Sequence, residues 1–411
     1  MAPQVRWFGW VILLAVSAMM QGGEQARAQT LNEGWNVLEG KFKGGPEGLA
    51  RGFTKGAKVD PNDKTHLEAI DLLAKVHTYG VYLRKLEMKP NEIAKEFDTF
   101  ATLVDKDIAR DPQGMQAFAE LFRDRVRVHA LEVLQFPKAL PIHKLHNARV
   151  LAKIAKLGQP ELADTLIAVL KDPQQNDGVR YYMLQGLATL MPQLPPPLQA
   201  KCAGALVEFL EQKKGPGQNA TPEEIEGFHV FRRAAVRALA KVRTPAIDDK
   251  VRPALVLAQF AGNDARIQPP PRIDERVEAA IGLARMHSPK DKQYQADYAA
   301  GQIAKCLGAL AQEAESERAN KEIRTHPWKI LAARLEEALA DLKKNNDKNN
   351  YVVQIVDRGT QLLHKIINGA QINANEQTWW SSPQSDPPSK ELFQGSADSA
   401  IKPGQPSEPE K

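Results

Sequence analysis

Basic side chains cluster on one predicted helix in the middle of the chain, and their spacing suits the binding of an anion. The cluster contains Arg232, Arg233, Arg237, Lys241 and Arg243. Arg233 and Arg237 lie one turn apart, so they share a face of the helix. Such a face can hold an acidic segment of a partner or a phosphate-bearing polymer. The same pattern is also typical of a solvated helix face, with Arg232 in a structural role.

Two adjacent tryptophans lie at the edge of a polar segment near the C-terminus. Exposed tryptophans often anchor interfaces, although this pair could instead dock on the last helix pair of the fold. The possible partner-binding residues from these two regions are Arg233, Arg237, Lys241, Arg243, Trp379 and Trp380.

Histidines and cysteines give little indication of a metal site. His143 and His146 are three residues apart and could bind a metal together with His129, but no carboxylate or thiolate ligand is evident nearby. Solvated or core histidines are the alternative interpretation. Cys202 and Cys306 each lie in an apolar helical stretch, which is typical of buried thiols, and the sequence leaves open whether they form a disulfide. We therefore predict no metal site.

Catalytic motifs are absent from the sequence. We find no nucleophile elbow, zinc-protease motif, phosphate-binding loop, paired-cysteine zinc site or EF-hand loop. The net charge of +5, from 55 basic and 50 acidic residues, is too mild to indicate nucleic-acid binding. The sequence therefore predicts no enzyme activity, no cofactor and no nucleic-acid partner.

Three helical segments that carry the basic cluster and its neighbours share one pattern. In each segment an arginine occupies the second position, a leucine follows seven residues later, and an apolar residue comes three residues after the leucine. The segments are 179–190, 231–242 and 275–286, and a weaker copy at 146–157 has Asn147 for the arginine and Ile154 for the leucine. Self-similar helical units predict a stacked helical array, with Leu187, Leu239 and Leu283 in its core.

The helix–turn–helix order of this region, with Asp172-Pro173 before Val179-Arg180, resembles bacterial HEAT-like repeats over about residues 140–300. The resemblance implies that Arg180, Arg232 and Arg276 pack on their turns and bond neighbouring backbone. Insertions at 215–220 and 262–274 lengthen the repeats, and a helix is expected to start at Thr221. The predicted fold class is all-α: an α-solenoid of stacked antiparallel helix pairs, a HEAT-like or armadillo-type superhelix, with disordered termini.

The N-terminus has the pattern of a secretory signal peptide over residues 1–28. Arg6 precedes an apolar run, and Ala26-Arg27-Ala28 forms a cleavage site. The run is shorter than the roughly 20 residues of a spanning helix. We therefore expect cleavage after Ala28, export to the periplasm or the extracellular space and no membrane span afterwards; a retained anchor is the alternative.

Composition and helix signals divide the remainder of the chain into four parts. Residues 29–64 are rich in Gly and Lys and predict a flexible arm. Residues 65–136 form an N-terminal helical segment, with a capping box from Thr65 to Glu68. Residues 137–372 are expected to form the HEAT-like repeat domain. Residues 373–411 are Pro- and Ser-rich and predict a disordered tail.

The functional expectation is an exported, non-enzymatic protein-binding scaffold, because helical solenoids present extended surfaces. Two alternatives stay open. One is a cofactor- or chromophore-modifying protein, as the resemblance to HEAT-like bilin lyases implies. The other is a binder of an anionic cell-surface polymer, which acts through the basic cluster. The sequence leaves open the identity of the protein partner, the binding face and the oligomeric state.

Overall fold

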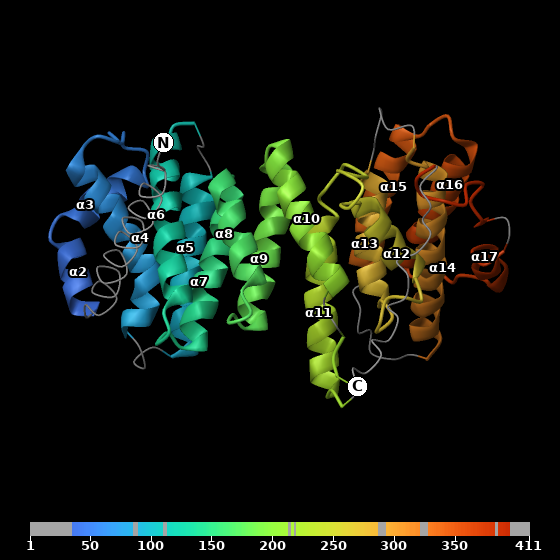
Figure 1. Cartoon of the computed structure of the whole chain (residues 1–411), viewed down its shortest axis with the longest axis horizontal. Helices are drawn as coiled ribbons and strands as arrows, with labels where there is room; N and C mark the ends of the chain where they lie inside the picture. Colours follow the sequence, from blue (N-terminus) through green and yellow to red (C-terminus); the bar gives the residue numbers. More distant parts are fainter. Residues whose placement is uncertain are drawn as a thin grey trace, which may run out of the picture. The chain divides into compact units, whose positions relative to one another are not determined.

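The computed structural model confirms the all-α class and divides the chain into two units, Met1–Leu190 and Met191–Lys411 (Figure 1). The described residues contain no strand, and Tyr294 and Phe393 form an isolated bridge. The structure describes residues 35–84, 89–109, 113–212, 215–217, 219–286, 293–320, 328–382 and 385–394.

Unit 1 is a set of packed helices with an aromatic core. Its elements are α2 (Trp35–Lys43), α3 (Pro46–Phe53), α4 (Lys64–Arg84), α5 (Pro90–Thr102), the π-helix η2 (Leu103–Ile108), α6 (Gln116–Gln135), α7 (Pro141–Ile154), the 3-10 helix η3 (Ala155–Leu157), α8 (Pro160–Lys171) and α9 (Asp177–Leu190). Helix α4 packs on α6, α6 on α7, and α7 on α9 (Figure 1). Phe100, Phe118 and Phe122 are fully buried, and the last two stack with their ring centroids 5.4 Å apart.

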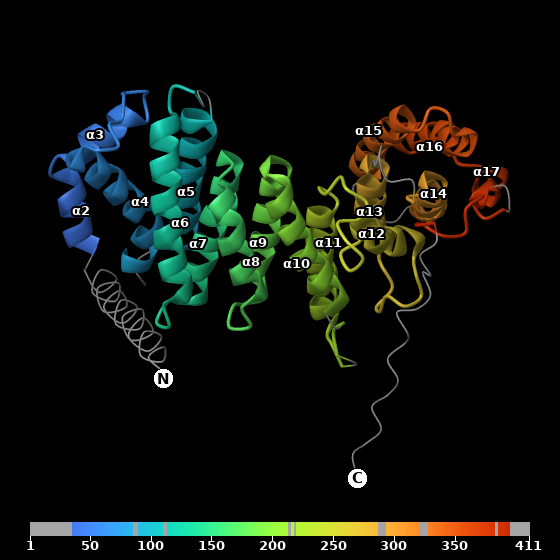
Figure 2. The same cartoon turned by 45° about the horizontal axis from the view of Figure 1, so that its top comes forward.

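The expected flexible arm is wrong for residues 35–53, which form α2 and α3 and pack on α4 (Figure 2). Trp35, Leu38 and Phe42 recur at helical spacing, and all three belong to the hydrophobic cluster that α4 helps to form. The apolar residues are few, but they share one face of α2, which explains why the composition alone was misleading.

Helix α4 also begins differently from the expectation. The carboxylate of Asp63 accepts hydrogen bonds from the backbone amides of Thr65 (2.7 Å) and His66 (3.3 Å). Asp63 therefore caps the helix in place of Thr65, because an Asx side chain just before the first turn reaches the same unpaired amides.

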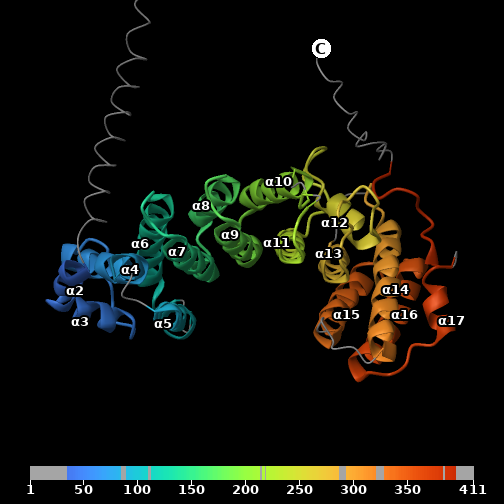
Figure 3. The same cartoon turned by 90° about the horizontal axis from the view of Figure 1, so that it is seen from below.

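Unit 2 is a second set of packed helices. Its elements are the 3-10 helix η4 (Met191–Gln193), α10 (Pro196–Gln212), α11 (Pro222–Leu239), α12 (Pro253–Gly262), α13 (Ile273–Arg285), α14 (Ala296–Asn320), α15 (Trp328–Asn345), α16 (Asn350–Asn368) and α17 (Ala374–Trp379). Contacts recur between next-but-one helices: α11 with α13, α12 with α14, α13 with α15, and α14 with α16 (Figure 3). The predicted helix start at Thr221 is confirmed, and a capping box forms there: Thr221 Oγ1 accepts from the amide of Glu224 at 3.2 Å, and the Glu224 carboxylate accepts from the Thr221 amide at 2.8 Å.

The C-terminal segment is folded further than expected, through Gln394. The tail prediction from residue 373 is therefore wrong for α17 and for 385–394. Leu392 and Phe393 are buried, and the backbone amide of Gln295 donates to the carbonyl of Leu392 at 2.8 Å. The hydroxyl of Ser389 donates to Asp297 at 2.7 Å. These contacts fasten the segment to the start of α14.

Two predictions fall outside the described residues: the signal peptide with its cleavage after Ala28, and the last part of the tail. Among the helices that are described, none combines the length and the apolar character that a membrane crossing requires.

Candidate functional site

The repeated arginines all bond the main chain, as the family resemblance implied. Arg180 Nε donates to the carbonyl of Leu170 at 2.8 Å, and Arg276 Nε donates to the carbonyl of Ala261 at 3.2 Å. Arg232 donates through a terminal nitrogen to a proline carbonyl in the turn before α13, at 2.8 Å. Each arginine thus satisfies a carbonyl at the end of a helix or in a turn, where no helical amide is available.

The weaker copy of the pattern also bonds the main chain, but in the middle of α4 and within its own helix. Asn147 replaces the arginine, is fully buried, and donates to the carbonyls of Thr78 at 3.1 Å and His143 at 3.0 Å. The aliphatic position seven residues later is fully buried in all four copies. These residues are Ile154, Leu187, Leu239 and Leu283. The core prediction for the three leucines is therefore confirmed.

The predicted basic cluster on α11 faces acidic residues of α13. Arg232 is buried and bonds the carboxylate of Glu275 through Nε at 2.6 Å and through a terminal nitrogen at 2.9 Å. Arg233 bonds Asp274 at 2.5 Å. Burial acts to raise the pKa of Glu275, but the hydrogen bonds from Arg232 and His229 outweigh it and hold that pKa below its ordinary value.

A second carboxylate, Glu278, receives arginines from two helices. Arg237 of α11 donates to it at 2.9 Å, and Arg334 of α15 donates two bonds of 2.7 Å each. The Glu278 side chain has no solvent exposure. Burial would raise its pKa, but the bonds from Arg334 and Arg237 outweigh that effect and the pKa is lowered. The carboxylate therefore stays charged and ties α11, α13 and α15 together.

The other two members of the cluster differ in their surroundings. Lys241 is half-buried; burial lowers its pKa, and the nearby cations Arg285 and Arg334 lower it further. Arg243 is exposed. The cluster is thus mainly a network of ion pairs between helices, with Arg233 and Arg237 already bonded to acids of α13.

The two tryptophans pack against other helices of unit 2. Trp379 and Trp380 are buried, and their rings meet edge to face with centroids 4.7 Å apart. The guanidinium of Arg358 lies over the Trp379 ring at 4.3 Å. Trp380 packs on Gly308 of α14 so closely that a Cβ there would lie 2.7 Å from the Trp380 Cβ. Both residues therefore contribute to packing in this structure.

The three histidines considered for a metal site have separate contacts. His129 lies between Asp71 at 2.8 Å and Glu132 at 3.2 Å. His146 donates from Nε2 to a backbone carbonyl of α4 at 2.9 Å, and His143 accepts from the amide that precedes α7 at 3.3 Å. Over the described part of the chain, no group of His, Cys, Asp and Glu side chains could hold a metal ion. Both cysteines are buried thiols.

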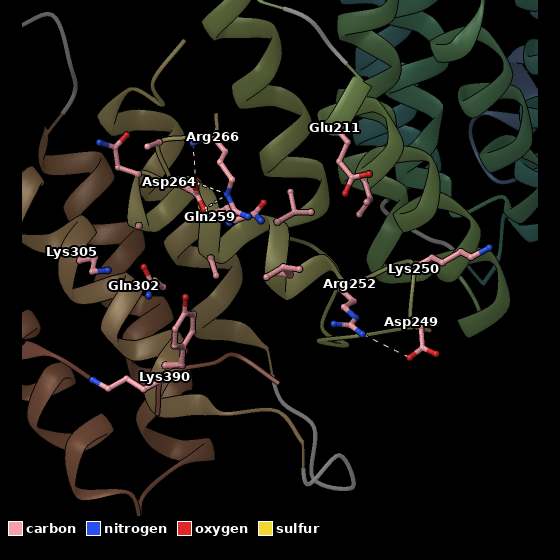
Figure 4. Close-up of a pocket in the computed structure, with 18 residues that line it drawn as sticks. Glu211, Asp249, Lys250, Arg252, Gln259, Asp264, Arg266, Gln302, Lys305 and Lys390 are labelled. Atoms are coloured by element: carbon pink, nitrogen blue, oxygen red, sulfur yellow. Dashed lines mark hydrogen bonds and ion pairs between the residues drawn. The ribbon is translucent and has the colours of Figure 1, made fainter. Parts of the chain in front are cut away.

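The candidate binding site is a cavity of about 640 Å³ within unit 2, bordered by α10, the loop before α12, α12 with its following turn, α14 and the C-terminal segment (Figure 4). Its charged lining residues are Glu211, Asp249, Lys250, Arg252, Asp264, Arg266, Lys305 and Lys390. Cations outnumber acids, so the cavity favours an anionic group.

The acids and arginines of the cavity are largely engaged with one another. Arg266 Nε donates to both carboxylate oxygens of Asp264, at 2.9 and 3.1 Å, and these bonds hold the pKa of Asp264 below its ordinary value. Arg252 lies 3.9 Å from Asp249 (Figure 4). Partial desolvation at the cavity wall raises the pKa of Glu211.

The three lysines of the cavity remain available. Lys250, Lys305 and Lys390 are exposed and come from the loop before α12, from α14 and from the C-terminal segment. Among the described residues, none of their ammonium groups forms a salt bridge or donates a hydrogen bond to the protein. Sequence reasoning missed these lysines because they are isolated in the chain; no local pattern marks them, and only the folding of the C-terminal segment brings Lys390 to the cavity.

Comparisons of the chain with models of protein families, with curated proteins and with solved structures found no match.

Proposed function

We propose that the chain is an exported, non-enzymatic protein-binding scaffold, built on HEAT-like repeats that stack as an α-solenoid. The observation that carries the proposal is the matching contact of Arg180 and Arg276, each of which donates from Nε to the carbonyl of the next-to-last residue of the helix before it. A contact that recurs in two helical units, with a fully buried aliphatic residue seven positions later in all four copies of the pattern, favours a repeat architecture over an irregular bundle.

Packing between next-but-one helices supports the same proposal. In unit 2, α13 contacts both α11 and α15, and α14 contacts both α12 and α16. This alternation is the arrangement expected when helix pairs stack on one another, because each helix pair then covers the apolar face of the next pair. Solenoids of this kind are used mainly for binding, through surfaces formed by many repeats.

The test is an affinity capture from an envelope extract, with the chain from Gln29 to Lys411 as bait. We expect one or a few proteins to be enriched reproducibly, and mass analysis of the native protein to show Gln29 as its first residue. A bait with Leu239→Ala serves as a control for folded repeats, and it should lose the partner together with its thermal stability. Capture of no protein, with a covalent adduct or tightly bound small molecule in the intact mass, would contradict the scaffold proposal and favour a cofactor-modifying protein.

A further inference from the structure

We propose that the unit 2 cavity is a binding site for an extended acidic peptide, in which the lysines hold side-chain carboxylates and the glutamines hold the peptide backbone. This inference rests on the proposed scaffold function, because it names the chemistry of the partner and the place where it binds. The acidic peptide would be a segment of the partner protein.

An amide at the cavity wall without a partner in the described chain is the first observation that points to a ligand. Gln302 of α14 is 6% exposed and lines the cavity (Figure 4). Its side-chain amide makes no hydrogen bond to any described residue. The residue is largely buried but its amide opens on the cavity, where it can both donate and accept hydrogen bonds. A ligand in the cavity supplies that partner.

The local backbone is shaped to keep this amide in place. Gly262, the last residue of α12, faces Gln302 so closely that a Cβ there would lie 2.1 Å from the Gln302 Oε1. The next residue, Asn263, ends α12 in the left-handed region with φ 59°. The helix end therefore leaves room for the Gln302 amide, and a side chain at position 262 would displace it.

The charges indicate an anion with spaced carboxylates. Lys250, Lys305 and Lys390 line one cavity from three elements, and the ammonium groups of Lys250 and Lys390 lie at its outer edges (Figure 4). A lysine is a point charge on a flexible stem, so three of them can follow charges at several positions of a chain. None of these ammonium groups forms a salt bridge to a described residue, whereas the arginines of α11 do.

The neutral lining residues distinguish a peptide from a phosphate or sulfate polymer. Gln259, Asn263 and Gln302 have side-chain amides, which both donate and accept hydrogen bonds, as a peptide backbone does. Glu211, Asp249 and Asp264 also line the cavity, and they would repel the dense charge of a polyphosphate or a sulfated polysaccharide. A volume of about 640 Å³ lies within the usual range of ligand sites and suits a few residues of an extended chain.

The test measures fluorescence anisotropy with a labelled peptide of alternating Glu and Ala, and with a second peptide in which Gln replaces every Glu. We expect the Glu peptide to bind, with affinity that falls as salt rises. The variant Lys250→Gln/Lys305→Gln/Lys390→Gln should weaken binding about tenfold or more, since each exposed ion pair contributes up to about 1 kcal/mol. The variant Gln302→Met keeps the volume and removes the amide, so it should weaken binding at every salt concentration.

A matched control has the same loss of charge elsewhere in unit 2. Lys329, Lys344 and Lys348 are exposed and do not line the cavity. The variant Lys329→Gln/Lys344→Gln/Lys348→Gln should bind the Glu peptide as the unaltered chain does. Equal weakening in both triple variants, or a polyphosphate or heparin that binds the cavity more tightly than the Glu peptide, overturns the assignment.

The capture experiment separates failure of this inference from failure of the scaffold proposal. If the cavity variant captures the same partner as the unaltered chain, the scaffold function stands and the cavity assignment is wrong. If the unaltered chain captures no partner but binds the Glu peptide through the cavity lysines, the scaffold proposal is wrong and the cavity remains an acidic-peptide site.

Discussion

Two cationic regions of unit 2 look alike in composition but differ in what surrounds them. On α11, Arg232, Arg233 and Arg237 meet carboxylates of α13 that have little or no solvent exposure. Around the cavity, three exposed lysines face open space. Arginine can bond a carboxylate with two nitrogens in a fixed geometry, which suits a buried pair, whereas lysine retains a mobile, strongly hydrated charge. The comparison teaches that the denser cluster of cations stabilises the fold, and that the dispersed one is available to a partner.

The largest expected effect comes from removing a buried carboxylate of the arginine network. The variant Glu275→Ala leaves Arg232 and His229 buried without their partner, which should lower the free energy of unfolding by about 3–5 kcal/mol. Urea unfolding followed by tryptophan fluorescence measures it, since Trp328, Trp379 and Trp380 all lie in unit 2.

The matched control for that variant is Glu337→Ala. Glu337 is 74% exposed and pairs with Arg285 at the surface, so its removal should change the free energy of unfolding by less than about 1 kcal/mol. If both variants unfolded at the same urea concentration, the distinction between a structural network and a solvated cluster would be lost.

The second effect tests whether the packing of α11 holds the arginine network in place. Leu239 is fully buried on α11, and Leu239→Ala should cost about 2–5 kcal/mol through lost packing and the cavity left behind. A thermal melt checks this against Ile330→Ala, at a position that is 61% exposed. No shift in the melting temperature for Leu239→Ala would contradict the alignment of the repeats.

A histidine network in unit 1 sharpens the comparison, because its charge depends on pH whereas arginine stays charged. Burial acts to lower the pKa of His129, but the hydrogen bonds to Asp71 and Glu132 outweigh it and the pKa is raised. The stabilisation is therefore fully present below the ordinary histidine pKa of about 6.5 and is lost as pH rises through the raised value.

Removing the imidazole should remove that dependence. Circular dichroism melts between about pH 6 and pH 9 should show the unaltered chain losing stability relative to His129→Gln as pH rises. His364→Gln is the control, since His364 is 57% exposed where it contacts Glu336. Parallel curves for the unaltered chain and His129→Gln would show that this network does not stabilise unit 1 through its charge.

Part of this architecture could be predicted from the sequence, and the reasons are local. Periodicity gave the all-α class, and the Thr221 capping box needs only four residues in the correct order. The ends of the fold could not be predicted from composition. Helix α2 is ordered by a few apolar residues on one face, and 385–394 is ordered by contacts with the start of α14, about 90 residues earlier in the chain, such as Ser389 with Asp297.

The candidate site was harder to predict, because pairing depends on tertiary structure. The sequence identified the cations of α11, but Arg233 and Arg237 find their acids 41 residues away, on α13. The cavity also depends on contacts distant in the chain, because Lys250, Lys305 and Lys390 lie far apart in the sequence and share no local pattern. A cluster along the chain therefore indicates charge density but not whether the charge is free.

The smallest expected effect on stability comes from the cavity lysines themselves. Lys305→Gln removes an exposed charge that forms no salt bridge to a described residue, so the free energy of unfolding should change by less than about 0.5 kcal/mol. The same urea titration that detects Glu275→Ala measures it. A fall of several kcal/mol would mean that Lys305 stabilises the fold as the arginines of α11 do, and the comparison between the two cationic regions would then fail. If the urea midpoint is unchanged and peptide binding is weakened, Lys305 contributes to binding and not to stability. This is the expected result, because the lysine charge contributes only when an anion enters the cavity.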